Sequence, residues 1–173
     1  KFKNKNILIS GGNSDIAKSL INDFINLGSN VFFTCKSDSI VQELKKNIKL
    51  INGVECKGYT LDILNFGDHK SFWDTLENKP EIVISCVGYM SSAPDSYYDD
   101  NLEALKTMNI NYLGLVNLFN IIAKYFKLKK SGVIVGISSV AGDRGKKSNY
   151  IYGSAKSGFS SYLSGLRNKL FED

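Results

Sequence analysis

The stretch Asn6-Ile-Leu-Ile-Ser-Gly-Gly-Asn-Ser-Asp-Ile-Ala17 decides the fold, because an apolar run enters a glycine turn that opens a helix. Residues 6–10 are typical of a buried strand. From Ser14 to about Leu27 apolar residues recur at helical spacing, and Gly28 fits the end of that helix. The chain therefore begins with a strand followed directly by a helix.

The turn between these two elements is suited to bind phosphate. A turn from a strand into a helix directs free backbone N–H groups to one point, and the helix dipole adds a partial positive charge there. Gly11 and Gly12 allow the tight turn and a close approach of a ligand to the backbone, and Ser14 either caps the helix or donates to a phosphate oxygen. Two glycines also close ordinary strand-to-helix loops, so the turn alone leaves both interpretations open.

Strands and helices alternate along the rest of the chain. Strands are expected at residues 31–34, 54–60, 82–85 and 132–137, and helices at about 39–48, 66–76, 102–125 and 150–170. Strands that are apolar on both faces indicate a parallel sheet covered by helices on each side. Right-handed crossovers leave few topologies, of which the doubly wound Rossmann fold is the commonest. We predict one α/β domain over residues 1–173 with three αβα layers.

The composition argues against several classes of function. The 173 residues carry a formal net charge of +5, without a basic run interleaved with aromatic residues, which disfavours nucleic-acid binding. No segment resembles a signal peptide, and no apolar run approaches the roughly 20 residues needed to span a membrane. The three cysteines lack metal-ligand spacing, and His69 is the only histidine. We expect no metal site, free thiols and a cytoplasmic location.

Tyr152 and Lys156 lie four residues apart in the last predicted helix, so their side chains share one face. A free phenol has a pKa of about 10, and a nearby positive charge lowers it because that charge favours the phenolate. Such a pair can exchange a proton near neutral pH. The same spacing also fits an ordinary amphipathic helix with a half-buried tyrosine and a solvated lysine.

The end of the second predicted strand indicates which dinucleotide fits the glycine turn. Folds of this kind recognise the adenosine ribose about 20 residues after the turn, with an acid for NAD or a base for NADP. Here the chain reads Thr34-Cys-Lys-Ser37, with no carboxylate at the strand end and Lys36 just beyond it. This favours NADP(H) over NAD(H), although Lys36 also fits a solvated surface position.

With these features in place, nearly the whole chain resembles the classical short-chain dehydrogenase/reductase family. Residues 10–17 resemble its Thr-Gly-x-x-x-Gly-x-Gly turn, and Ser85-Cys-Val-Gly88 occupies the place of its Asn-Asn-Ala-Gly motif. Asn111 lies in Asn109-Ile-Asn-Tyr-Leu-Gly114, which matches the segment with the asparagine of the family's catalytic tetrad. Ser138-Ser-Val-Ala-Gly142 matches the fifth-strand motif, and Tyr152 follows Ser139 at the family spacing of thirteen residues.

The resemblance implies a role for each matching residue. Tyr152 would act as the general acid in carbonyl reduction, and Lys156 would lower its pKa and hold the nicotinamide ribose. Ser139 would bind the substrate oxygen, and Asn111 would fix a helix kink and a water molecule that relays protons. Simpler roles stay open, because Ser139 also fits a strand-end cap and Asn111 a packed helix position. The expected catalytic residues are Asn111, Ser139, Tyr152 and Lys156.

The same resemblance extends to the cofactor site. Asp62 and Ile63, after the third predicted strand, match the pair that meets the adenine ring. The residues expected to contact the cofactor are Gly11, Asn13, Ser14, Asp15, Ile16, Lys36, Asp62, Ile63, Cys86, Val87, Gly88, Tyr152 and Lys156.

Some positions depart from the family pattern in ways that matter for the site. Asp15 and Ala17 replace two glycines of the turn; alanine still allows close packing, whereas the carboxylate should point outward or weaken phosphate binding. Ser85 and Cys86 replace two asparagines, which removes amides that would tie neighbouring strands together. These departures affect cofactor affinity and local rigidity more than the chemistry.

Two other functions remain possible for this fold. A non-catalytic dinucleotide sensor or scaffold would tolerate the altered turn, but it has no chemical need for the Asn, Ser, Tyr and Lys set. A nucleotide-sugar epimerase or dehydratase uses the same Tyr and Lys pair, but it spaces the glycines one residue closer and needs a C-terminal substrate domain. Hydride transfer to or from a carbonyl or secondary alcohol is therefore the preferred hypothesis.

A narrower resemblance concerns residues 138–170, which are similar to bacterial reductases of a keto-sugar on a polyprenyl phosphate carrier. Family members continue beyond a helix such as 150–170 with another strand and a substrate-covering loop, so the chain is expected to be truncated at its C-terminus. They also pair the helices here at 102–125 and 150–170, which implies a homodimer or homotetramer. The residues that either line the substrate side or pack the loop after the fourth strand are Tyr89, Met90, Tyr97 and Tyr98.

Overall fold

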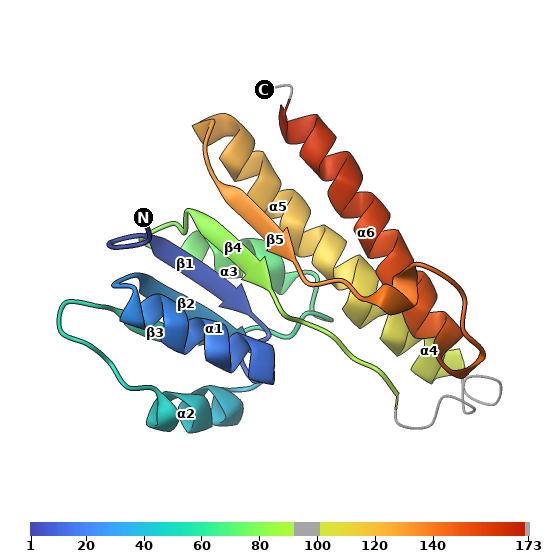
Figure 1. Ribbon diagram of the computed structural model, residues 1–173, viewed down its shortest axis with the longest axis horizontal. Coiled ribbons are helices and arrows are strands. Elements are labelled where there is room, and N and C mark those ends of the chain that lie inside the picture. Colours follow the sequence, from blue (N-terminus) through green and yellow to red (C-terminus); the bar gives the residue numbers. More distant parts are fainter. Residues whose placement is uncertain (92–100, 172–173) are drawn as a thin grey trace.

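A computed structural model, which describes residues 1–91 and 101–171, places five parallel strands in one sheet (Figure 1). The strands are β1 (Asn6–Ser10), β2 (Asn30–Cys35), β3 (Cys56–Thr60), β4 (Ile82–Ser85) and β5 (Val133–Gly136). Their order is β3-β2-β1-β4-β5, so the chain winds outward in both directions from β1. This is the doubly wound arrangement that the sequence predicts, and a ligand in it binds where the strand order reverses, between β1 and β4.

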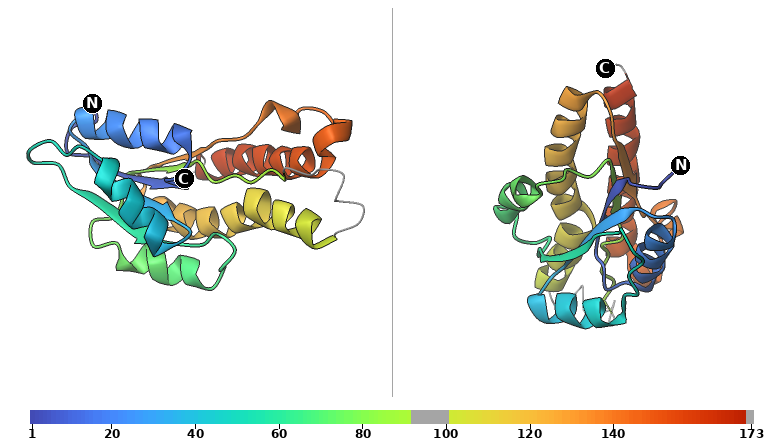
Figure 2. Two further views of the ribbon diagram at one scale, coloured as in Figure 1. Left: turned by 90° about the horizontal axis from the view of Figure 1, so that it is seen from below. Right: turned by 90° about the vertical axis from the view of Figure 1, so that its left-hand side faces the viewer.

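Helices cover both faces of the sheet. α1 (Asp15–Asn26) and α2 (Asp38–Asn47) pack on one face, where Ile7, Ile9 and Phe33 are buried. α3 (Asp68–Thr75) and α5 (Gly114–Lys129) pack on the other, and α6 (Tyr150–Phe171) runs beside α5 (Figure 2). Side chains alternate between the two faces of the sheet along each strand. Because helices cover both faces, the side chains on both faces are apolar, as a parallel sheet requires.

The long helix predicted at residues 102–125 is wrong in its continuity and its end. The structure has α4 (Asn101–Met108), then a π-helical turn, Asn109–Leu113, and then α5, which ends at Lys129. A π turn widens the helix by one residue, and such turns mark functional sites more often than ordinary helix. Asn111, at the centre of this turn, donates to the carbonyl of Thr107 at 2.9 Å, so its side chain stabilises the interruption.

The remaining predicted elements are confirmed with small shifts at their ends. The strand predicted at 54–60 begins at Cys56, and the strand predicted at 132–137 covers Val133–Gly136. Two short 3₁₀ helices, Val140–Gly142 (η3) and Lys147–Asn149 (η4), connect β5 to α6. These turns are too short for a periodic signal in the sequence.

Strand β5 forms one edge of the sheet within the described residues. Val133 and Val135 on it are 49% and 37% exposed. A groove of about 670 Å³ runs between β5 and α6 and is lined by apolar side chains that include Leu163, Leu166 and Leu170. An unpaired strand edge of this kind is a template for a further strand.

Candidate active site

The glycine turn forms as predicted at the carboxyl end of β1. Gly11 has φ +78°, a left-handed conformation that glycine adopts without strain. A Cβ atom added at Gly11 would lie 2.8 Å from the backbone nitrogen of Val87 and 2.9 Å from the carbonyl carbon of Cys86. Glycine at this position therefore lets the turn lie directly against the residues that follow β4.

The start of α1 leaves backbone donors free for a ligand. Ser14 caps the helix, because its Oγ accepts from Ala17 N at 3.1 Å and its carbonyl from Lys18 N at 2.9 Å. The amide groups of Asp15 and Ile16 find no acceptor within residues 1–91 and 101–171. Of the four amides that a helix start leaves unpaired, two are thus available to bind phosphate oxygens.

The carboxylate of Asp15 points outward, which is the first of the two predicted alternatives, the other being weaker phosphate binding. Its side chain is fully exposed and forms an ion pair with Lys18 at 3.3 Å. Ala17 is fully buried under the turn, so alanine replaces the family's glycine there without opening the packing. The altered turn therefore keeps the shape of a phosphate site.

The loss of the two asparagines after β4 leaves a visible gap in the hydrogen bonding. Ser10, Thr34 and Ser85 lie side by side in the strand register, and all three are buried. Ser85 Oγ accepts from Val87 N at 3.4 Å, whereas Ser10 Oγ has no hydrogen-bond partner in the part of the chain that the structure describes. The expected loss of side-chain ties between strands is consistent with this unpaired hydroxyl.

Asn111 is fully buried and uses its whole side chain. Its Oδ1 accepts from Tyr89 N at 3.0 Å, and its Nδ2 donates to Tyr89 O at 2.6 Å and to Thr107 O at 2.9 Å. The amide thus joins the π turn to the segment after β4. These bonds give Asn111 a structural role at the interruption of the helix.

Lys156 reaches the same place from α6. Its Nζ donates to Ile137 O at 3.0 Å, and the residue is only 3% exposed. A Cβ atom added at Gly88 would lie 3.6 Å from Asn111 Oδ1 and 3.8 Å from Lys156 Nζ, so both polar groups approach the position where a side chain of residue 88 would begin. Burial lowers the pKa of Lys156 below its usual value, and the Cys86 thiol opposes this shift.

Tyr152 lies one helical turn before Lys156 on α6, as predicted. Lys156 Nζ is 5.9 Å from the centroid of the Tyr152 ring, within reach of a cation–π attraction. Cys86 lies near the same ammonium: burial raises the pKa of its thiol, and Lys156 opposes that rise. Tyr152, Lys156 and the end of β4 therefore meet in one place.

Ser139 directly precedes η3, which packs on α6 through two close backbone contacts. Its Oγ accepts from Ala141 N at 3.2 Å and so caps η3, as the simpler alternative proposed, while the hydroxyl hydrogen stays available to donate. A Cβ atom added at Gly153 would lie 2.6 Å from Ala141 O, and one at Gly142 would lie 2.8 Å from Ser157 N. These glycines let η3 pack on the turns of α6 that carry Tyr152 and Lys156.

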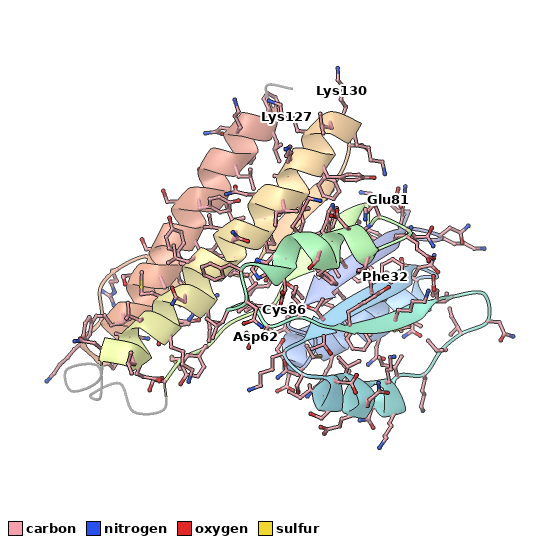
Figure 3. All side chains as sticks on the ribbon, turned by 180° about the vertical axis from the view of Figure 1, so that it is seen from behind. Phe32, Asp62, Glu81, Cys86, Lys127 and Lys130 are labelled. Carbon is pink, nitrogen blue, oxygen red and sulfur yellow. The ribbon has the colours of Figure 1, made fainter. Side chains whose placement is uncertain are left out.

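The residues expected at the adenosine end lie apart from this group. Lys36 is exposed and lines a cavity of about 320 Å³ together with Asp62. Asp62 Oδ1 accepts from Leu64 N at 2.9 Å, whereas the side chain of Ile63 is buried in the core, which leaves its backbone for any adenine contact. In Figure 3, Lys127 and Lys130 lie at the end of α5 that is far from the labelled Asp62 and Cys86.

The sequence left open whether Tyr89 lines the substrate side or packs the loop after β4 onto the domain, and its side chain does pack onto the domain. Its ring and hydroxyl contact Glu103 and Lys106 on α4, which the motifs do not indicate. Met90 is 59% exposed, and Tyr97 and Tyr98 lie outside the described residues. The only available signal was the position of Tyr89 directly after the Ser85–Gly88 motif.

A comparison with protein families shows which class of protein this site belongs to. The family model described as short chain dehydrogenase matches residues 5–173. The chain belongs to the short chain dehydrogenase family. The members of this family are oxidoreductases that bind NAD(P)(H), so the polar group around Gly88 lies in a dehydrogenase or reductase fold.

Relatives and solved structures agree with this membership. The chain is 26% identical over 182 residues to a "Dehydrogenase/reductase SDR family protein 7-like" of Dictyostelium discoideum, covering 97% of this chain and 55% of that protein. It is 25% identical over 180 residues to an "NADP-dependent 3-hydroxy acid dehydrogenase" of Schizosaccharomyces pombe, covering 99% and 68%. The chain thus spans about half to two thirds of the length of these relatives.

Two solved structures share the fold at low sequence identity. NAD⁺-bound xylitol dehydrogenase superposes with a TM-score of 0.90 at 19% identity, covering 99% of this chain and 67% of its own. An NADPH-bound form of ElxO superposes with a TM-score of 0.86 at 21% identity, covering 98% and 69%. The two differ in the cofactor they hold, so fold similarity alone does not select NAD or NADP.

Two further searches concern metals and membranes. Among residues 1–91 and 101–171, no group of three or more His, Cys, Asp or Glu side chains is arranged to hold a metal ion. In the same residues no helix is both long enough and apolar enough to cross a membrane.

Proposed function

We propose that this protein transfers a hydride between a nicotinamide cofactor and a carbonyl or secondary alcohol. The observation that carries the proposal is the pair of buried groups, Asn111 and Lys156, which both lie within 4 Å of the Cβ position at Gly88. Among the described residues Lys156 forms no ion pair. A buried ammonium of this kind is costly to keep, so a functional reason for it is expected. The packing of η3 on α6 adds Ser139 and Tyr152 to the same region.

Each of the four side chains has a distinct task in this reaction. Tyr152 gives its proton to the substrate oxygen during reduction, and Lys156 stabilises the phenolate that remains. Ser139 donates its free hydroxyl hydrogen to the same oxygen as negative charge develops there. Asn111 holds the Tyr89 backbone and the π turn, which keeps Lys156 and Gly88 in register. The cofactor, when bound, supplies or accepts the hydride.

The residues present fit a dinucleotide. The free amides of Asp15 and Ile16 and the dipole of α1 suit the pyrophosphate, and Gly11 and Gly88 leave room for close approach. We expect Asn13, Ser14, Cys86, Val87 and Asp62 to contact the same cofactor. We favour NADP(H) over NAD(H), because Lys36 follows β2 where a carboxylate would select NAD.

The substrate we favour is a keto-sugar carried on a polyprenyl phosphate. Residues 138–170 carry the resemblance, and the loop between Ser139 and Tyr152 adds a physical reason. Arg144, Lys146 and Lys147 on this loop are exposed and make no ion pair among the described residues. Such a loop next to the reacting carbonyl is suited to attract a phosphate group.

The assembly and location follow the same resemblance. We propose one NAD(P)-binding domain in the cytoplasm that forms a homodimer or homotetramer through residues 102–125 and 150–170. Leu102, Leu105 and Leu113 are 75%, 57% and 44% exposed on the first of these segments, which supports an apolar contact there.

The variant Tyr152→Phe tests the proposed reaction in the full-length protein. Loss of the phenol removes the proton donor but leaves the dinucleotide site, so we expect turnover to fall by about 10² to 10⁴ with unchanged cofactor affinity. Oxidation of NADPH at 340 nm with a panel of keto-sugars measures turnover, and fluorescence titration measures affinity. Turnover equal to that of the unsubstituted protein would refute the role of Tyr152.

The same assay separates the two alternative functions. Net oxidation of NADPH indicates a reductase, and sugar conversion without net oxidation indicates an epimerase or dehydratase. Binding of NADPH without any conversion indicates a dinucleotide sensor.

A further inference from the structure

Tyr89, the residue after Gly88, is held through its backbone and through its side chain. Both its N–H and its carbonyl bond to the Asn111 amide, at 3.0 and 2.6 Å. Its hydroxyl donates to Glu103 Oε1 and accepts from Lys106 Nζ at 3.0 Å, so the side chain extends from the end of β4 to α4. The roles proposed above for Asn111 and Lys156 require no such connection to α4.

The side-chain contacts of Tyr89 are of the strong kind. Both partners of the hydroxyl are charged, and charge-assisted hydrogen bonds are about twice as strong as neutral ones. Lys106 Nζ also lies 4.1 Å from the centroid of the Tyr89 ring and 3.5 Å from Glu103 Oε2. The Glu103 side chain is 17% exposed, so water screens these contacts only partly. The phenol is therefore fixed at its ring face and at its hydroxyl.

The backbone contacts carry this restraint to the reacting region. Gly88 and Tyr89 share one peptide bond, which is planar and rigid. Because Tyr89 N is part of that peptide, anchoring Tyr89 to α4 also fixes Gly88. The Cβ position of Gly88 in turn lies 3.6 Å from Asn111 Oδ1 and 3.8 Å from Lys156 Nζ. Movement of the Tyr89 phenol would therefore shift the Gly88 backbone next to Lys156.

We propose that Tyr89 is a positioning residue. Anchored by Glu103 and Lys106, it holds the backbone of Gly88 against the nicotinamide half of the bound cofactor. The inference rests on the proposed function, because it takes Lys156 as the group that holds the nicotinamide ribose. Tyr89 exchanges no proton with the substrate. Because Tyr89 is anchored on α4, the position of that helix instead sets how close the Gly88 backbone lies to Lys156.

Two ligands separate the two halves of the cofactor site. NADPH occupies both halves, whereas 2′,5′-ADP lacks the nicotinamide half. In the full-length Tyr89→Phe variant, we expect NADPH to bind about threefold to tenfold more weakly, because one charge-assisted anchor is lost, and 2′,5′-ADP to bind unchanged. Lys106→Met, which changes a partly exposed side chain, should lower the ratio of NADPH affinity to 2′,5′-ADP affinity in the same way. It keeps the test informative if Tyr89→Phe does not fold.

Tyr162→Phe is the matched control. Its hydroxyl donates to Asn120 Oδ1 at 2.9 Å, so this variant also loses one phenol hydrogen bond. Tyr162 lies ten residues beyond Tyr152 on α6, about 15 Å along the helix. A purely structural role for Tyr89 predicts that both variants lose similar stability in urea and keep the same NADPH to 2′,5′-ADP affinity ratio.

The outcomes separate the inference from the function on which it rests. A changed ratio for Tyr89→Phe and Lys106→Met, with an unchanged ratio for Tyr162→Phe, supports the positioning role. An unchanged ratio in the first two variants overturns it while leaving the dehydrogenase assignment intact. Failure of the unsubstituted protein to bind NADPH or NADH would overturn both. If NADH is the ligand, AMP replaces 2′,5′-ADP in the same comparison.

Discussion

Replacement of Gly153 by alanine tests how closely η3 is packed on α6. In an isolated helix this change is stabilising, because alanine is favoured over glycine by about 1 kcal/mol. In the folded protein the new Cβ would lie 2.6 Å from the carbonyl oxygen of Ala141. That oxygen belongs to the backbone of η3, so it cannot move aside as a flexible side chain does.

The expected magnitude follows from this distance. Ordinary contact begins at 3.4 Å, so η3 and α6 must separate by about 0.8 Å. Overpacking of this kind costs about 1–3 kcal/mol, which offsets the helix preference and gives a net loss of up to about 2 kcal/mol. The same shift separates Ser139 from Tyr152, and a displacement near 1 Å lowers turnover by up to about 100-fold.

Gly165→Ala provides the control on the same helix. A Cβ at Gly165 meets no atom within 4 Å, so this variant should gain about 0.5–1 kcal/mol. Urea denaturation gives the free energy of unfolding, and NADPH oxidation gives the turnover. If Gly153→Ala were as stable as Gly165→Ala and fully active, the close packing of η3 on α6 would be wrong.

Two further perturbations address the glycine turn and the buried histidine. Gly11→Ala combines a φ of +78° with a Cβ 2.8 Å from Val87 N, so we expect a loss of about 1–3 kcal/mol in urea and weaker NADPH binding; unchanged affinity would contradict the proposed approach of the turn to β4. His69 is fully buried, and burial lowers its pKa below 6.5, against an opposing hydrogen bond to Asn117. Because the unfolded chain then binds the proton more readily, the free energy of unfolding should fall as the pH drops below about 6.5 through the lowered pKa. His69→Gln should flatten this dependence between pH 7 and 5.5 in urea titrations, and an unchanged slope would assign the effect to other groups.

The sequence predicts the order of strands and helices because each element has its own periodic signal. Asn6–Ser10 is apolar throughout, as a strand buried on both faces must be, and it enters a helix through two glycines. The interruption of the long helix has no periodic signal, and only the family resemblance, which implied a helix kink at Asn111, indicated it. Residues 101–129 remain helical in composition, and the π turn depends on hydrogen bonds that Asn111 makes to Tyr89, more than twenty positions earlier.

The candidate site divides in the same way. Tyr152 and Lys156 are one helical turn apart, so their shared face follows from the sequence alone. Three other features depend on how the folded chain packs. Lys156 is buried, Lys156 and Asn111 both approach Gly88, and Ser139 caps η3. Ile63 shows the limit most clearly, since its position matched an adenine contact while its side chain packs into the core.

By itself the sequence determined the alternation of elements, the glycine turn between β1 and α1 and the shared face of Tyr152 and Lys156, because spacing along a strand or helix fixes which side chains lie together. Asn111 and Ser139 were indicated by the family resemblance. Only the tertiary structure decided the outward direction of Asp15, the close approach of Gly153 to η3 and the anchoring of Tyr89 on α4. These depend on how separate elements pack, and packing distances of a few tenths of an ångström leave no periodic pattern in the chain.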